Sequence, residues 1–178
     1  MCALGPESVV LTDMDEVTPL LEANILLNGV MTAATEATGR AEFSAAPLLW
    51  GTPLPSRILE SCEAAARNGG LPAVVIASDV VYDPVGYAPL LHTLQSLLLP
   101  GDSDGGSCPL AEYAVLAQRH RNPEDYRFFD MVRDPSSKLR IEKITDGLAG
   151  GSDSWGVDAL QDIEIYVIRE DHPPEPLP

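Results

Sequence analysis

Residues 71–90 (LPAVVIASDVVYDPVGYAPL) decide how the fold of this 178-residue chain is interpreted. Their apolar run, residues 73–77, is typical of a strand that is buried on both faces, as in a parallel sheet. Polar residues follow the run directly, and a helical pattern then covers residues 87–99. Because ligands of open α/β sheets bind beyond the carboxyl ends of the strands, this corner predicts a site; a simple polar turn is the alternative.

Composition places the chain among ordinary globular proteins. Its length suits one domain with a sizeable core, and no run approaches the roughly 18 apolar residues of a membrane span. The N-terminus lacks the basic region of a signal peptide, and Cys2, Cys62 and Cys108 are too far apart for a zinc site or a disulfide framework. We therefore expect no metal, no membrane partner and a reducing, cytoplasmic setting, with the nucleus as a second location.

The charge narrows the possible partners. The formal net charge is −16. A surface this acidic repels a phosphate backbone, so we expect no nucleic-acid partner. A basic protein segment is the partner that the charge favours, and acidity that only serves solubility is the alternative.

The order of predicted elements indicates an α/β fold. Helical patterns near residues 17–25, 58–66, 87–99 and 123–132 alternate with short apolar or β-rich runs. The last two runs alternate apolar and polar residues and predict an antiparallel strand pair at the C-terminal end of the sheet. A Pro-rich tail, residues 172–178, is expected to be disordered. The predicted strands cover residues 8–12, 43–50, 73–77, 111–117, 139–144 and 163–168.

Two other residues lie just beyond predicted strands. Asp13 follows residues 8–12, and an ionised carboxylate there can accept hydrogen bonds from both hydroxyls of a ribose. The next helix can be capped by Asp15 or Thr18, and the alternative for Asp13 is that it and Asp15 merely cap this helix. Trp50 ends the run 43–50, where it can line an adenine pocket or simply belong to the core.

Five segments in this order resemble the eukaryotic protein-lysine methyltransferases of the seven-strand, S-adenosylmethionine-dependent class. They are VVLTDMDEVTPLLEANILLNG, LLWG, VVIASDVVYDPVGYAPLLHTL, YAVLAQRHRNPEDYRFF and IEIYVIRE, between Val9 and Arg169. That group includes the enzymes that act on valosin-containing protein, Hsp70 chaperones and translation elongation factors. The resemblance implies a Rossmann-like sheet, S-adenosylmethionine as cofactor, and a protein substrate such as a chaperone, an ATPase or a translation factor.

The resemblance also implies roles for the residues that bind the cofactor. Asp13 would contact the ribose, and Trp50 with Gly51 would lie near the adenine. Leu49 occupies the position where the family has an acidic residue, so the resemblance does not imply that residue's polar contact to the cofactor in this chain. Ser78 would add a contact at the start of the motif SDVVY.

In that motif, Asp79 and Tyr82 would face the methyl donor and the incoming lysine. The chemistry needs no nucleophile from the protein, because a sulfonium methyl is already activated. Orienting a neutral amine in line with that methyl supplies most of the rate. No GxSxG, HExxH or Walker motif suggests hydrolysis or nucleotide cleavage instead.

One family motif is not found in this sequence. Relatives carry a Gly-rich turn of the E-x-G-x-G type, which lets the backbone approach the cofactor. Residues 2–5 (CALG) resemble the end of the helix that follows this turn. We therefore expect the chain to begin after the first strand of the seven-strand sheet, to form a partial methyltransferase domain over residues 1–171, and to be inactive as written.

Two other functions remain open. The first is a non-catalytic pseudo-enzyme that binds a protein partner through the former substrate face. The second is a methyltransferase for small molecules or nucleic acids, because such enzymes share the fold. The negative charge disfavours nucleic acids but leaves the small-molecule function open.

Overall fold

The computed structural model describes residues 8–28, 42–67, 73–101, 108–144 and 163–171. The chain divides into two compact units, Met1–Leu71 and Pro72–Pro178. The predicted disordered tail and residues 2–5 lie outside the described residues. The prediction of one domain over residues 1–171 stays a prediction.

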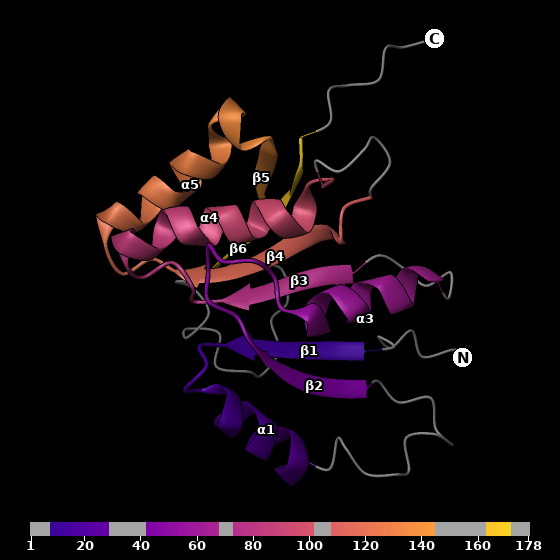
Figure 1. Ribbon diagram of the computed structural model, residues 1–178. Helices are drawn as coiled ribbons and strands as arrows, with labels where there is room; N and C mark the ends of the chain where they lie inside the picture. Colours follow the sequence, from indigo (N-terminus) through magenta and orange to yellow (C-terminus); the bar gives the residue numbers. More distant parts are fainter. Residues whose placement is uncertain (1–7, 29–41, 68–72, 102–107, 145–162, 172–178) are drawn as a thin grey trace, which may run out of the picture. The chain divides into compact units, whose positions relative to one another are not determined.

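The first unit is built on two parallel strands. β1 (Ser8–Asp13) pairs with β2 (Glu42–Pro47) along its whole length, so that both strands end at the same edge. α1 (Thr18–Leu27) contacts β2, and α3 (Ser56–Arg67) contacts β1 (Figure 1). The small core of this unit contains one buried side chain from each of α1, β2 and α3, namely Ile25, Ala46 and Ile58.

The start of α1 differs from the prediction. Val17 occupies the N-cap position, and no side chain caps the helix, so capping by Asp15 or Thr18 was wrong. The Thr18 hydroxyl instead donates to the carbonyl of Met14, and the Asp13 carboxylate accepts the Met14 N–H at 2.8 Å. The helix therefore begins in a backbone turn rather than at a side-chain cap.

The second unit is a four-stranded mixed sheet. Its order is β3 (Ala73–Ser78), β4 (Ala111–Arg119), β6 (Ile163–Glu170) and β5 (Leu139–Lys143). The first two strands are parallel, and β6 is antiparallel to both of its neighbours. The pairing of β5 with β6 confirms the predicted antiparallel pair, and the chain as a whole has a mixed α/β fold.

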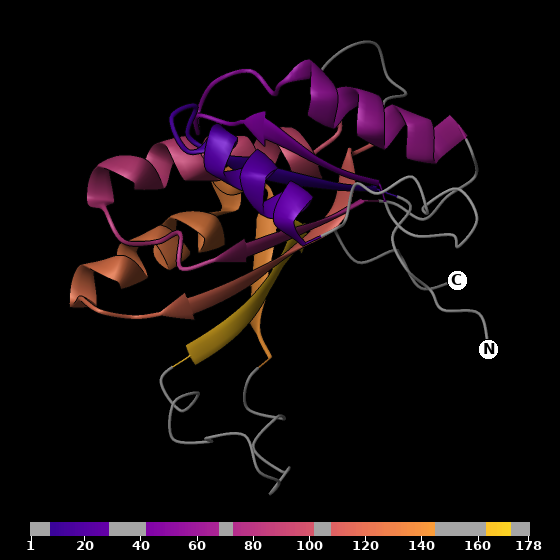
Figure 2. The ribbon, with the colours of Figure 1, turned by 90° about the horizontal axis from the view of Figure 1, so that it is seen from below.

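Two helices cover one side of this sheet. α4 (Pro84–Leu98) contacts β4, α5 (Tyr126–Arg133) contacts β5, and the two helices contact each other (Figure 2). Short 3-10 turns, Pro123–Asp125 and Pro135–Ser137, flank α5. Apolar side chains from both helices and the strands form the core of this unit, including Val81, Tyr87, Leu90, Leu94, Leu98, Leu116, Phe128, Phe129, Val132 and Ile168.

The prediction that residues 73–77 are buried on both faces was wrong. Side chains alternate along β3, and those of Val74 and Ile76 are exposed, the latter to 82%. These side chains are exposed because α4 and α5 both pack on the same side of the sheet. Alternate residues of a strand point to opposite sides, so every second side chain of β3 points away from the helices.

Three element ends also differ from the prediction. α4 begins at Pro84, not at residue 87, because the Asp83 carboxylate accepts the Val85 N–H at 3.0 Å and caps the helix. The predicted helix over residues 123–132 is a 3-10 turn followed by α5. β2 ends at Pro47, three residues before Trp50, because its partner β1 ends at Asp13, the residue that pairs with Pro47.

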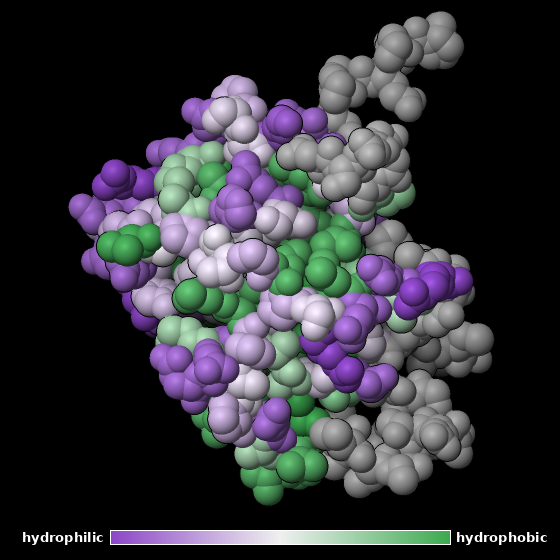
Figure 3. Space-filling model, in the orientation of Figure 1, coloured by the Kyte–Doolittle hydropathy of each residue, from purple (hydrophilic) through white to green (hydrophobic). Residues whose placement is uncertain are grey.

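The helices present different surfaces. Figure 3 shows hydrophobic side chains at the surface over α1, where Leu20, Leu26 and Leu27 are exposed. The outer side of α5 is hydrophilic, as expected of an amphipathic helix whose phenylalanines face the core. Among the described residues, no helix combines the length and the apolar character needed to cross a bilayer.

Candidate functional site

The predicted site residues of the second unit lie on one loop, directly after β3. Ser78 is the last residue of the strand, and Asp79 follows in the left-handed region, with φ 55°. Aspartate tolerates this conformation better than most residues, and the Asp79 N–H is satisfied by the carbonyl of Ala117 at 2.8 Å. Val81 is fully buried, whereas the next side chain, Tyr82, is 55% exposed. The loop is therefore anchored at Val81 and presents Tyr82 outward.

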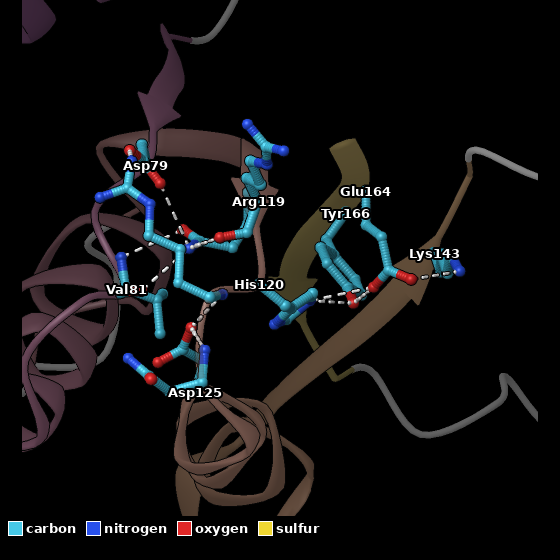
Figure 4. Close-up of polar contacts among 11 residues, drawn as sticks. Asp79, Val81, Arg119, His120, Asp125, Lys143, Glu164 and Tyr166 are labelled. Carbon is cyan, nitrogen blue, oxygen red and sulfur yellow. Dashed lines mark hydrogen bonds and ion pairs between the residues drawn. The ribbon is translucent and has the colours of Figure 1, made fainter. Parts of the chain in front are cut away.

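A buried glutamine on β4 anchors this loop. Gln118 is 1% exposed, and its Oε1 accepts the Val81 N–H at 3.1 Å. Its Nε2 donates to the Val81 carbonyl at 2.9 Å and to the Arg119 carbonyl at 3.0 Å. The same nitrogen lies 3.5 Å from Asp79 Oδ1. Figure 4 shows Asp79, Val81 and Arg119 gathered beside the end of β4.

The carboxylate of Asp79 has a cationic partner. Arg121 follows β4, and its Nη2 forms an ion pair with Asp79 Oδ2. Both side chains are partly exposed, the aspartate to 39%. A pair this exposed contributes little to stability, and another cation can compete for the carboxylate.

The buried side chain of Asp125 holds the segment that carries Arg121 through hydrogen bonds to its backbone. The Asp125 carboxylate accepts the backbone N–H groups of Arg121 and Asn122 at 2.9 and 3.2 Å, and the Tyr87 hydroxyl at 3.2 Å. Burial alone would raise the pKa of Asp125, but these donors and the nearby His120 outweigh burial and lower it. Burial and the Asp125 carboxylate raise the pKa of Tyr87. The carboxylate thus links α4 to the loop after β4.

A polar cluster under α5 borders this loop. The His120 ring stacks on Tyr126, and its Nε2 lies 3.0 Å from both the Tyr166 hydroxyl and Glu164 Oε2 (Figure 4). Burial and the hydrogen bond to Glu164 raise the pKa of Tyr166. Burial would raise the pKa of Glu164, but hydrogen bonds from Lys143 and Tyr166 outweigh it and lower that pKa. The cluster joins β4, β5 and β6.

The predicted cofactor residues of the first unit lie at one edge of its strand pair. Asp13 ends β1, and its carbonyl accepts the Leu48 N–H at 2.8 Å, just beyond β2. Trp50 and Gly51 follow in a turn, where Gly51 has φ 78°, a conformation that favours glycine. The Asp13 carboxylate is exposed. Because only one of its acceptor positions is used by Met14, it can accept further hydrogen bonds.

The structure therefore arranges the predicted residues in two groups. Ser78, Asp79 and Tyr82 lie together in the second unit, and Asp13 lies at the same strand edge as the Trp50–Gly51 turn in the first. Sequence reasoning missed Gln118 and Asp125, although one signal for the glutamine exists. Residues 114, 116 and 118 point to the same side of β4, so a polar residue stands in line with buried apolar ones.

Comparison with known families decides the class of the protein. Residues 1–135 match the sequence profile of a family described as lysine methyltransferase. The chain belongs to the lysine methyltransferase family. The match ends before β5, and a search of curated proteins found no match. Membership of this family implies in general the use of S-adenosylmethionine and a protein substrate.

Proposed function

We propose that the chain functions as an S-adenosylmethionine-dependent methyltransferase that modifies a lysine side chain of a protein. Family membership supports the class of reaction. The observation that carries the proposal further is the loop after β3, where a partly exposed Asp79 and an exposed Tyr82 flank a buried, hydrogen-bonded Val81. Such a loop offers a fixed carboxylate and a phenol to an incoming amine.

The proposed role of these two residues is to bind and orient the lysine. A carboxylate accepts hydrogen bonds from an ammonium group, and its negative charge attracts the cation. Arg121 already shows that Asp79 pairs with a cation in this position. The ammonium must lose a proton before it reacts, and the exposure of Asp79 leaves a path for that proton to solvent. Orientation of the neutral amine then supplies most of the rate.

Asp13 at the end of β1 and Trp50 beyond the end of β2 fit the cofactor by the chemistry of their side chains. Asp13 offers free acceptor positions for ribose hydroxyls, and Trp50 offers an aromatic face for an adenine. Gly51 and Ser78 complete the proposed cofactor-binding set. When bound, S-adenosylmethionine supplies a methyl group that its sulfonium has already activated.

The proposed substrate is a basic segment of a cytoplasmic protein, with the nucleus as the alternative location. The charge of −16 supports a basic partner, and the resemblance to known enzymes suggests a chaperone, an ATPase or a translation factor. The seven-strand sheet without its first strand stays a prediction. The predicted inactivity of the chain as written competes with the proposed activity, and the methyl-transfer experiment decides between them.

Methyl transfer tests the function. The chain is incubated with radiolabelled S-adenosylmethionine and a protein extract, and methyl-lysine is measured after acid hydrolysis of the protein. Label in methyl-lysine that is lost in Asp79→Asn supports the proposal and overturns the predicted inactivity. The matched control is Asp130→Asn, which removes a carboxylate from an exposed ion pair with Arg133 on α5.

Two results would favour other functions. Label in small molecules but not in protein would support a small-molecule methyltransferase. A folded chain that labels nothing, yet retains a protein partner through the loop after β3, would support the pseudo-enzyme.

A further inference from the structure

The side chain of Gln118, on β4, forms hydrogen bonds with both the N–H and the carbonyl of Val81, in the loop after β3. Its side chain accepts from the Val81 N–H and donates to the Val81 carbonyl, although the two residues are 37 positions apart in sequence. A primary amide has an acceptor and a donor at this spacing. An ionised glutamate in its place could not donate to the carbonyl, and an apolar side chain could do neither.

We call these two hydrogen bonds from Gln118 to Val81 the clamp. Val81 lies between the two residues that we propose to contact the substrate. Asp79 precedes Val81 by two positions, and Tyr82 follows it directly. Asp79 also has a left-handed backbone, which costs energy in a non-glycine residue unless its surroundings hold it. A fixed Val81 backbone therefore limits the positions that both flanking side chains can reach.

We propose that Gln118 is a positioning residue that holds the Asp79–Tyr82 loop in the geometry that receives the lysine amine. This inference rests on the proposed function. Gln118 itself does not need to touch the substrate, because its buried amide acts through the backbone of Val81 and lies 3.5 Å from Asp79 Oδ1.

Two variants remove the clamp in different ways. Gln118→Met keeps the length of the side chain but has neither a strong donor nor a charge, and Gln118→Glu keeps the shape but loses the donors when its carboxyl group is ionised. The matched control is Gln95→Glu on α4, because Gln95 Nε2 likewise donates to a backbone carbonyl, that of Ser137, at 3.0 Å. Circular dichroism tests whether each variant is folded. If Gln118→Glu is unfolded, Gln118→Met alone carries the test.

The first readout is hydrogen exchange of the Val81 amide, which is independent of any activity. Loss of one buried hydrogen bond should speed this exchange about tenfold in either Gln118 variant. Gln95→Glu should leave it unchanged. Unchanged exchange in both Gln118 variants would overturn the proposed clamp.

The second readout is binding of a small lysine probe, followed by NMR. Nα-acetyl-lysine methylamide should shift the amide signals of the Asp79–Tyr82 loop in the wild-type chain and in Gln95→Glu, whereas the norleucine analogue, which has no ammonium, should not. We expect the dissociation constant for the lysine probe to rise about tenfold in the Gln118 variants.

The two readouts separate the possible failures. Faster Val81 exchange with unchanged lysine binding would overturn the link between the clamp and the substrate. A wild-type chain that binds the probe but transfers no methyl group would contradict the proposed reaction while supporting the role of Gln118. A wild-type chain without lysine-specific shifts would overturn the inference together with the lysine site.

Discussion

Arg121 and Asp79 form an ion pair at the place where we expect the substrate cation to bind. If Arg121 competes with lysine for the carboxylate, Arg121→Gln should strengthen binding of the capped lysine probe. The unfolding free energy should change by less than about 1 kcal/mol, because exposed ion pairs contribute little. NMR titration and urea unfolding measure the two effects.

The control for this substitution is Arg133→Gln, which breaks the exposed ion pair with Asp130 on α5. It should leave lysine binding unchanged. Weaker lysine binding in Arg121→Gln would show that the arginine helps to hold the substrate rather than competing with it.

The buried Asp125 carboxylate should make the free energy of unfolding depend on pH. Its folded-state pKa is lowered, so its ionised form stabilises the fold fully above the unfolded value of about 3.9, and this contribution is lost as the pH falls through the folded-state pKa. Asp125→Asn should cost about 1–3 kcal/mol near neutral pH, because an amide N–H₂ then faces backbone donors. In urea unfolding from pH 6 down to about pH 2, the free energy of unfolding should fall less steeply in Asp125→Asn than in the wild-type chain.

Asp130→Asn serves as the comparison, since Asp130 is an exposed carboxylate on α5, the helix that follows Asp125. It should keep the wild-type dependence on pH. Equal pH profiles for Asp125→Asn and the wild-type chain would contradict the role given to the buried carboxylate.

The sequence predicted candidate substrate contacts, which stay predictions, but not the buried side chains that hold their loop. Asp79 and Tyr82 belong to a short local motif, so a pattern of four neighbouring residues suffices to find them. Gln118 and Asp125 act across 37 and 38 positions of sequence, on Val81 and Tyr87. Such contacts depend on strand pairing and helix packing, which local patterns do not specify.

The cap of α4 gives a prediction at the scale of elements. Asp83 accepts the Val85 N–H at the start of the helix, and Pro84 occupies the first turn. Asp83→Ala should lower the unfolding free energy of the second unit by about 1 kcal/mol. Asp130→Ala, which removes a carboxylate that caps no helix, should change it less. Equal losses in urea unfolding would contradict the capping role.

The order and type of the elements could be predicted because apolar runs and turn residues are local signals. Their ends could not, since the Asp83 cap makes α4 begin earlier and β2 ends at Pro47, opposite the last residue of β1. The exposure of Ile76 was missed for another reason. An apolar run indicates a buried strand, but the placement of helices on one side of the sheet decides which faces are covered.

At the scale of the whole molecule, the net charge of −16 should oppose folding at low salt. Like charges repel across the surface, and at 0.1 M added salt screens the repulsion between charges more than about 10 Å apart. We expect the melting temperature to rise between dilute buffer and about 0.2 M NaCl. A fall over this range in a thermal melt followed by circular dichroism would mean that attractive ion pairs outweigh the repulsion.

The most direct test of the methyltransferase assignment is a calorimetric titration of the folded 178-residue chain with S-adenosylmethionine. We predict saturable binding that weakens about tenfold in Asp13→Ala, because a charged acceptor for the ribose is lost. Asp15→Ala, which removes a neighbouring exposed carboxylate, should bind like the wild-type chain. A folded chain with no saturable binding, or equal binding by both variants, would contradict the cofactor site at the end of β1.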